Sequence, residues 1–120
     1  MTWLYEQESG ALSHNVELIA TGYSGADDGK NNPAMQKIHN KGPIPIGAYT
    51  IGAPRNTMTH GPFVLPLTPD DENEMFGRSG FLIHGDSVVH PGTASEGCII
   101  LSRQIREQIW NSGDRELEVV

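Results

Sequence analysis

The lone cysteine, Cys98, and His84 are the residues of this chain best suited to nucleophilic chemistry. Cys98 stands in a tight glycine turn at the start of the apolar run 98–101, and His84 closes the apolar run 81–84. If both runs are buried strands, they carry a thiol and an imidazole to the same edge of a sheet. A neighbouring imidazole can remove the thiol proton, and the thiolate is the working nucleophile. The pattern therefore predicts a Cys–His pair.

The residues around Cys98 support this hypothesis. Gly97 has no side chain, so the backbone amides beside it are open to approach and could hold an oxyanion. Ser95 and Thr93 supply nearby hydroxyls, and the loop through His90 is rich in Gly and Pro and has little reason to be core. The structural alternative is that Cys98 is a small buried apolar residue, which is the usual place of a single cysteine.

A zinc site is the second alternative, because His84, Asp86, His90 and Cys98 all carry zinc-binding atoms. Their spacing matches none of the stronger zinc patterns, and neither HExxH nor paired CxxC occurs in the sequence. We therefore expect no metal and no other cofactor. The remaining histidines are expected at the surface, in polar turns: His14, His39 and His60.

Length and charge narrow the class of protein. At 120 residues the chain suits one compact domain whose core needs no metal or disulfide. With 15 acidic and 8 basic residues its net charge is −7, which argues against nucleic acid and anionic membranes as partners. The first twelve residues include Glu6, Gln7 and Glu8 in place of a basic start and an apolar segment. We therefore expect neither a signal peptide nor a membrane span.

Short apolar runs, punctuated by 14 glycines and 8 prolines, predict a β-rich single domain over residues 1–120 rather than a helix bundle. Strands are expected at residues 2–7, 11–14, 16–21, 48–51, 63–67, 81–84, 98–101 and 116–120. A short helix is expected at residues 34–39. A longer helix should begin at a Ser102 cap, run through Trp110 and end before Gly113.

The sequence resembles L,D-transpeptidase catalytic domains at the residues singled out above. Their signature is a histidine followed by Ser/Thr-His-Gly-Cys, and here His84-Gly85 is followed by Ser95-Glu96-Gly97-Cys98. The full chain looks closer to one branch, the short L,D-transpeptidase-like effectors of bacterial type VI secretion. This similarity includes the stretches GYSG (22–25), NP (32–33), GPIPIGAY (42–49) and RSGFLIHG (78–85).

The resemblance implies a β-sandwich-like fold and a peptidoglycan stem peptide as substrate. Cys98 would be the nucleophile, His84 the general base, and the backbone carbonyl of Gly85 the group that orients the imidazole. The thiol would attack the carbonyl before a terminal D-alanine, and the thioester would pass to water (L,D-carboxypeptidase) or to an amine (L,D-transpeptidase). The Gly97 amide would be an oxyanion donor. The expected substrate contacts are Ser95, Arg78, Thr93 and His90.

An effector of this branch implies an immunity protein as partner, and delivery by a secretion machine in place of a signal peptide. We expect a monomer that is made in the cytoplasm and acts in the periplasm of a target bacterium. Two places depart from the general signature: Glu96 replaces its second histidine, and Ile99 and Ile100 follow the cysteine where the signature usually has a polar residue. The carboxylate is expected to point away from the thiol or to pair with Arg78 or Arg103. The alternatives are a zinc-dependent amidase or peptidase that uses His84, His90 and Cys98, and a non-catalytic wall-binding module in which Cys98 is buried.

Overall fold

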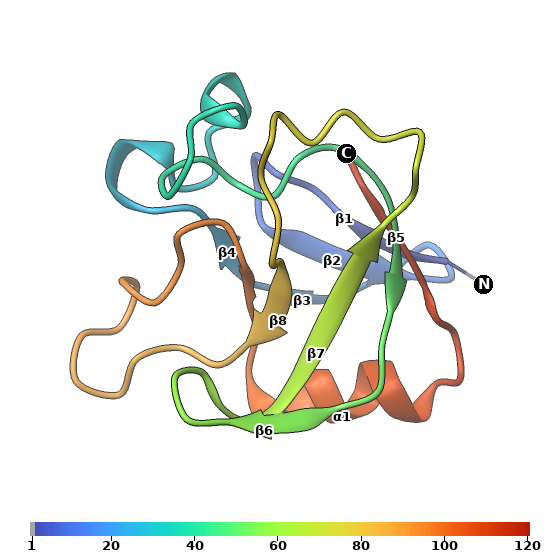
Figure 1. Ribbon diagram of the computed structural model, residues 1–120. Coiled ribbons are helices and arrows are strands. Elements are labelled where there is room, and N and C mark those ends of the chain that lie inside the picture. Colours follow the sequence, from blue (N-terminus) through green and yellow to red (C-terminus); the bar gives the residue numbers. More distant parts are fainter. Residues whose placement is uncertain (1) are drawn as a thin grey trace.

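Short apolar runs between glycine and proline turns become strands in the computed structural model, which describes residues 2–120 (Figure 1). The strands are β1 (Trp3–Tyr5), β2 (Ala11–His14), β3 (Glu17–Thr21), β4 (Tyr23–Ser24), β5 (Gly47–Ile51), β6 (Arg55–Thr57), β7 (Gly61–Pro69), β8 (Leu82–His84), β9 (Ile99–Ile100) and β10 (Glu116–Val119). The helical elements are the 3₁₀ turns η1 (Asp27–Gly29) and η2 (Pro33–Met35) and the helix α1 (Arg103–Asn111). Within residues 2–120, no helix has the length and apolar character needed to cross a membrane.

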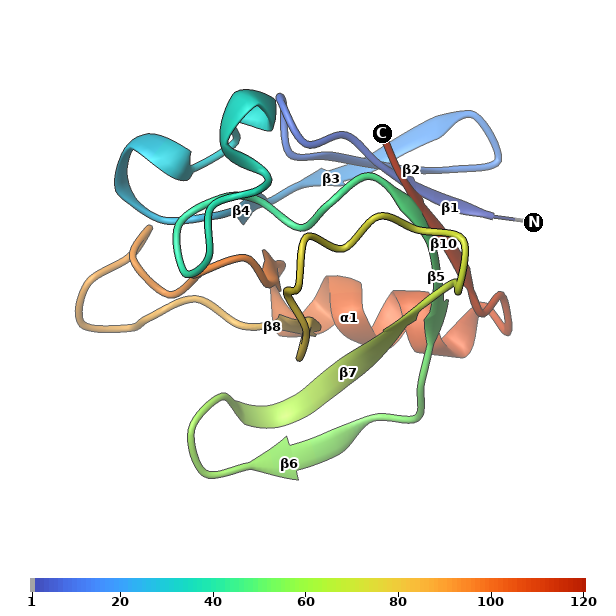
Figure 2. The ribbon, with the colours of Figure 1, turned by 45° about the horizontal axis from the view of Figure 1, so that its top comes forward.

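The strands join in one hydrogen-bonded sheet with the order β3-β2-β1-β10-β5-β7-β8-β9-β4, and β6 pairs with β7 as a hairpin. Figure 2 shows β1–β3 on one side of the molecule and the β6–β7 hairpin on the other, with α1 between them in this view. Most neighbouring strands are antiparallel, but β1 pairs with β10, and β8 with β9, in parallel. The predicted β-rich, sandwich-like single domain is confirmed, and its layers belong to one continuous sheet.

Inward-facing residues of the strands and of α1 form an apolar core. Its most buried members include Trp3, Tyr5, Leu12, Ile44, Leu65, Ile83, Ile99, Ile109 and Leu117. Ile83 of β8 and Ile99 of β9 are register partners in the parallel pair. Because this pair is locked in the core, the residues next to it are held on rigid elements, where a functional site is best positioned.

The helix α1 forms where the sequence predicts it. The Ser102 hydroxyl accepts a hydrogen bond from the Ile105 amide at 3.3 Å, as expected for an N-cap. Ile109 turns into the core, and Gly113 follows the helix with a φ of +81° that favours glycine. The predicted cap, length and end of this helix are confirmed to within one residue.

The helix predicted at residues 34–39 is wrong, because only the 3₁₀ turn η2 and a series of tight turns form there. The segment has no apolar face to bury, since Ile38 is largely exposed. One of its main-chain carbonyls is also bound by a side chain from another part of the chain. The Gln36 carbonyl, which an α-helix would give to the Asn40 amide, accepts a hydrogen bond from Arg78 at 2.7 Å. The prediction also lacks β4, which has two residues, and β6, which is polar throughout.

Candidate active site

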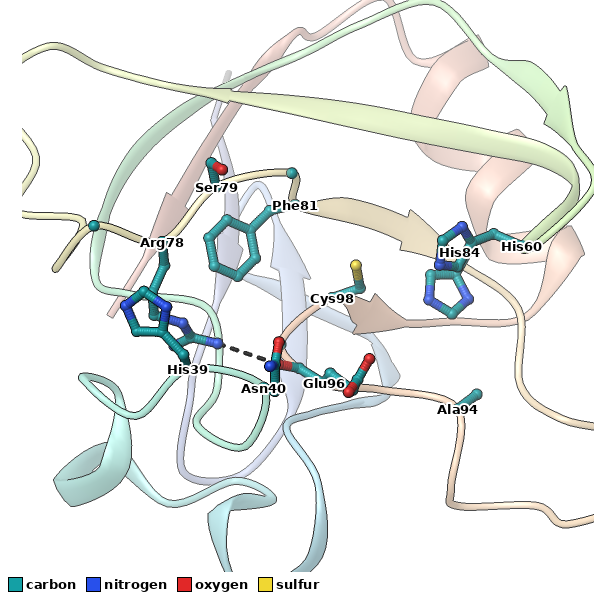
Figure 3. A pocket seen from close by; sticks show the side chains of 13 residues that line it. His39, Asn40, His60, Arg78, Ser79, Phe81, His84, Ala94, Glu96 and Cys98 are labelled. Carbon is teal, nitrogen blue, oxygen red and sulfur yellow. Dashed lines mark hydrogen bonds between the residues drawn. The ribbon is translucent and has the colours of Figure 1, made fainter.

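The parallel pair β8–β9 brings His84 and Cys98 to one face of the sheet. Ile83 and Ile99 are partners and point into the core. Because side chains alternate along a strand, the flanking residues His84 and Cys98 both point to the opposite face. They line a cleft of about 340 Å³ there (Figure 3). The cleft is lined by His39, Asn40, His60, Gly77, Arg78, Ser79, Gly80, Phe81, His84, Ala94, Glu96, Gly97 and Cys98.

Cys98 is partly buried, and the backbone amide of Leu82 lies beside its sulfur. Burial raises the pKa of the thiol above its ordinary value, and the Glu96 carboxylate adds to the rise. The Leu82 amide and the Arg78 guanidinium act on this pKa in the opposite direction but do not cancel the effect of burial. Cys98 is therefore a protonated thiol at neutral pH and needs a base before it can act as a nucleophile.

His84 has the form that a general base requires. The side chain is only 3% exposed, and its Nδ1 lies 2.9 Å from the carbonyl oxygen of Gly85. Because a carbonyl accepts, this contact assigns the proton of the neutral ring to Nδ1 and leaves Nε2 as the acceptor. Burial lowers the pKa of His84; His60 and Arg106 lower it further, while the Gly85 contact and Asp86 raise it. The ring is therefore neutral at neutral pH.

The Cys98 thiol and the His84 imidazole line the same cleft. In the structure as described for residues 2–120, they form no direct hydrogen bond with each other. Catalytic hydrogen bonds are often long in the free enzyme and tighten when the substrate binds. With both groups neutral, a proton can pass from the sulfur to Nε2 when the two approach each other directly or through one water. The arrangement is suited to general-base activation of Cys98 rather than to a resting thiolate–imidazolium pair.

A family model of the Tlde1 domain matches residues 19–120, a range that contains the whole cleft. The chain belongs to the Tlde1 domain family. This is a family of type VI secretion L,D-transpeptidase effectors, so the resemblance found in the sequence is confirmed at the level of the family. Family membership indicates L,D-transpeptidase-type enzyme activity directed at peptidoglycan. No curated protein matches the chain.

In this Tlde1 domain, Ser95 fixes the turn that carries Cys98. The side chain is only 1% exposed. Its hydroxyl accepts hydrogen bonds from the amides of Gly25 and Gly97 and donates one to the Cys98 carbonyl at 2.6 Å. Ser95, a predicted substrate contact, therefore has its hydroxyl engaged by the main chain and does not line the cleft. The Gly97 amide, the predicted oxyanion donor, already donates a hydrogen bond to the Ser95 hydroxyl at 3.0 Å.

Thr93 and His90, the next two predicted substrate contacts, lie in the exposed loop between β8 and β9 and do not line the cleft. The Thr93 hydroxyl donates to the His90 carbonyl at 2.5 Å, and the His90 amide donates to the Ser87 hydroxyl at 2.9 Å. The loop is tied to β4 through Asp86, which accepts a hydrogen bond from the Tyr23 hydroxyl at 2.5 Å. The contacts of Thr93 and His90 therefore stabilise the loop itself.

Arg78 lines the cleft, but its guanidinium is occupied by main-chain oxygens. It donates hydrogen bonds of 2.7–3.2 Å to the carbonyls of Gln36, Gly42, Pro43 and Glu96. Arg78, also a predicted substrate contact, therefore clamps residues 36–43 to the turn that carries Cys98. The Glu96 carboxylate forms no ion pair with Arg78 or Arg103 in the described part of the chain, and Arg103 instead pairs with Glu107 at 3.1 Å.

Two histidines of this Tlde1 domain that the sequence predicts at the surface also line the cleft. His60 comes from the turn of the β6–β7 hairpin, and its ring centroid lies 4.6 Å from that of His84. The Nε2 of His39 lies 2.8 Å from the carbonyl oxygen of Phe76. Both rings are exposed, as predicted, but neither shares a local motif with Cys98, so only the tertiary structure reveals their place in the site.

The zinc alternative requires His84, His90 and Cys98 to converge on one point. His90 lies outside the cleft that the other two residues line. Among residues 2–120, no three His, Cys, Asp or Glu side chains are grouped so that they could hold a metal ion. The geometry therefore gives this alternative no ligand set.

Proposed function

We propose that this protein is a cysteine-dependent peptidoglycan enzyme that acts on stem peptides as an L,D-carboxypeptidase, an L,D-transpeptidase or both. The observation that carries the proposal is the position of Cys98 and His84 on one face of the β8–β9 pair, in the cleft of a Tlde1 domain. Cys98 is the nucleophile and His84 is the general base. The Gly85 carbonyl orients the imidazole through its contact with Nδ1.

The reaction begins when Nε2 of His84 takes the thiol proton, directly or through one water. The Cys98 sulfur then attacks the carbonyl carbon that joins the L-centre of a diamino acid to the terminal D-alanine. The C–N bond breaks, the new C–S bond remains as a thioester, and the proton on His84 goes to the leaving amine of D-alanine. Attack by water releases a shortened stem peptide, whereas attack by an amine gives exchange or a cross-link; both restore the thiol.

The tetrahedral intermediate needs hydrogen-bond donors that are fixed before the reaction. We assign this function to the amide of Cys98 itself, because the Gly97 amide is committed to Ser95. The buried guanidinium of Arg78, only 7% exposed, adds a fixed positive charge beside the cleft. Such a charge favours the developing anion more strongly in a partly buried site than it would in water.

Membership of an effector family supports a role as an antibacterial toxin. We propose that the protein is made in the cytoplasm, acts in the periplasm of a target bacterium and is counteracted there by an immunity protein. The net charge of −7 disfavours anionic membranes and nucleic acid as alternative targets.

The test is mass spectrometry of purified disaccharide-tetrapeptide after incubation with the protein. The wild type should remove the terminal D-alanine, and an added D-amino acid should appear in its place if exchange occurs. Cys98→Ala and His84→Ala should leave the substrate unchanged, with circular dichroism showing that both variants fold. Binding of the wild type to peptidoglycan without any change in muropeptide mass would support the wall-binding alternative instead.

A further inference from the structure

A second imidazole packs on the proposed general base. The ring of His60 lies with its centroid 4.6 Å from that of His84, and the two rings are tilted by 51°. Both rings line the same cleft as the Cys98 thiol (Figure 3). The contact joins the β6–β7 hairpin to the end of β8, so it is a product of the fold.

The hairpin turn that carries His60 is fixed by two threonines. The Thr57 hydroxyl accepts a hydrogen bond from the His60 amide at 2.8 Å. The Thr59 hydroxyl lies 3.0 Å from Nδ1 of the His60 ring. These contacts engage Nδ1 and leave Nε2 as the nitrogen that can exchange a proton with the cleft.

The helix α1 holds the hairpin beside His84 through Arg106. This buried side chain donates hydrogen bonds from Nη1 to the carbonyls of Pro62 and Phe63, each at 2.9 Å. A Cβ on Gly85 would lie 2.9 Å from Nη2 of the same guanidinium, so Arg106 also borders the residue that orients the His84 ring. The contact between the two imidazoles is therefore supported by a rigid element.

The charged groups that act on His84 come from three elements: His60 on the hairpin, Arg106 on α1 and Asp86 after β8. The Cys98 thiol is a further titratable group of the cleft. Protons on both imidazoles would place like charges side by side, so a proton on His60 opposes a second proton on His84. At a separation of 4.6 Å and a water-like dielectric, this repulsion weakens proton binding about fivefold.

We propose that His60 is a positioning residue for the general base: its ring holds the His84 imidazole in place, and a proton on His60 weakens the binding of a proton to that imidazole. The effect on turnover rests on the proposed function, whereas the coupling between the two imidazoles does not.

Two substitutions separate the ring from the charge. His60→Phe keeps an aromatic ring and removes the charge, and His60→Gln removes both. Met58→Gln is the control, because Met58 is fully exposed on the same turn and does not line the cleft. NMR of the imidazole carbons records the protonation of His84 between about pH 5 and 9, and release of D-alanine from disaccharide-tetrapeptide is measured over the same range.

In both His60 variants, His84 should bind its proton about fivefold more tightly than in the wild type at mildly acidic pH. The acid limb of the pH profile of kcat/KM should move to higher pH, to a proton concentration about fivefold lower. At about pH 8, His60→Phe should keep turnover within about twofold, whereas His60→Gln should lose about tenfold because the His84 ring is less well placed. Met58→Gln should behave like the wild type in both measurements.

A wild-type titration of His84 in both His60 variants would overturn the effect of charge. Equal turnover of His60→Phe and His60→Gln at alkaline pH would overturn the effect of the ring. If the wild type releases no D-alanine, the proposed function fails, but the NMR titration still decides whether His60 acts on His84. Should one variant fail to fold, the other carries the titration.

Discussion

Gly97 leaves no room for a side chain in the turn before Cys98. Its φ is +145°, and an added Cβ would lie 2.5 Å from Nη2 of Arg78 and 2.9 Å from Cε1 of Phe81. An L residue in such a conformation costs about 1–3 kcal/mol. Arg78 would also have to give up a main-chain partner, and a hydrogen bond to a charged group contributes about 1.5–3 kcal/mol. We predict that Gly97→Ala lowers the free energy of unfolding by about 3 kcal/mol or more.

Urea unfolding followed by tryptophan fluorescence measures this loss, and Gly113→Ala is the matched control. Gly113 has a φ of +81°, but no heavy atom lies within 4 Å of an added Cβ. The control should therefore lose only the conformational part, about 1–2 kcal/mol. Release of D-alanine by Gly97→Ala should also fall at least about tenfold, because the turn that carries the nucleophile is displaced. Equal losses of stability in the two variants would refute the reasoning, since they would show that Arg78 and Phe81 do not fill the space beside Gly97.

Three further predictions concern the cleft. Because burial raises the pKa of the Cys98 thiol, its thiolate fraction should be smaller than that of a free cysteine. The rate of alkylation should therefore be lower than that of a free cysteine at about pH 8, and it should still increase with pH above the ordinary pKa of 9.0. An alkylation rate that reaches its plateau below neutral pH would contradict this. Arg78→Met, which removes four main-chain contacts, should lower the free energy of unfolding in urea by about 3 kcal/mol or more, and a loss below about 1 kcal/mol would mean that the clamp is unimportant. His84→Gln should abolish release of D-alanine, whereas His90→Gln, outside the cleft, should change kcat less than about threefold; the opposite pattern would mean that the base is wrongly assigned.

Local signals were enough to predict most of the sheet and the helix α1. Residues 81–84 and 98–101 are apolar runs on either side of a polar loop, so the sequence predicts that both are buried. Continuous apolar runs of this kind are typical of parallel strands that are buried on both faces. The cap at Ser102 is equally local, since a serine before an amphipathic run is sufficient to mark a helix start. Residues 34–39 failed this test because the Gln36 carbonyl is bound by the side chain of the distant Arg78, which no local pattern can reveal.

The candidate site was predictable only in part. The alternation of side chains along β8 and β9 is a local property, and it brings His84 and Cys98 to one face. The polar residues around them were harder to interpret, because the same residue type can serve the substrate or the main chain. Ser95 and Arg78 are polar and close to the cysteine, but their side chains form hydrogen bonds with main-chain groups of the protein itself. His60 is the converse case, since an apparently ordinary turn residue is carried into the site by a hairpin.

The thioester on Cys98 is the central claim, and intact-protein mass spectrometry tests it most directly. Wild-type protein is mixed rapidly with disaccharide-tetrapeptide, quenched with acid and weighed. The expected adduct adds to the protein the mass of the substrate minus that of the released D-alanine, maps to the peptide that contains Cys98 and is absent from Cys98→Ala. Release of D-alanine that continues in Cys98→Ala at the wild-type rate would contradict the account.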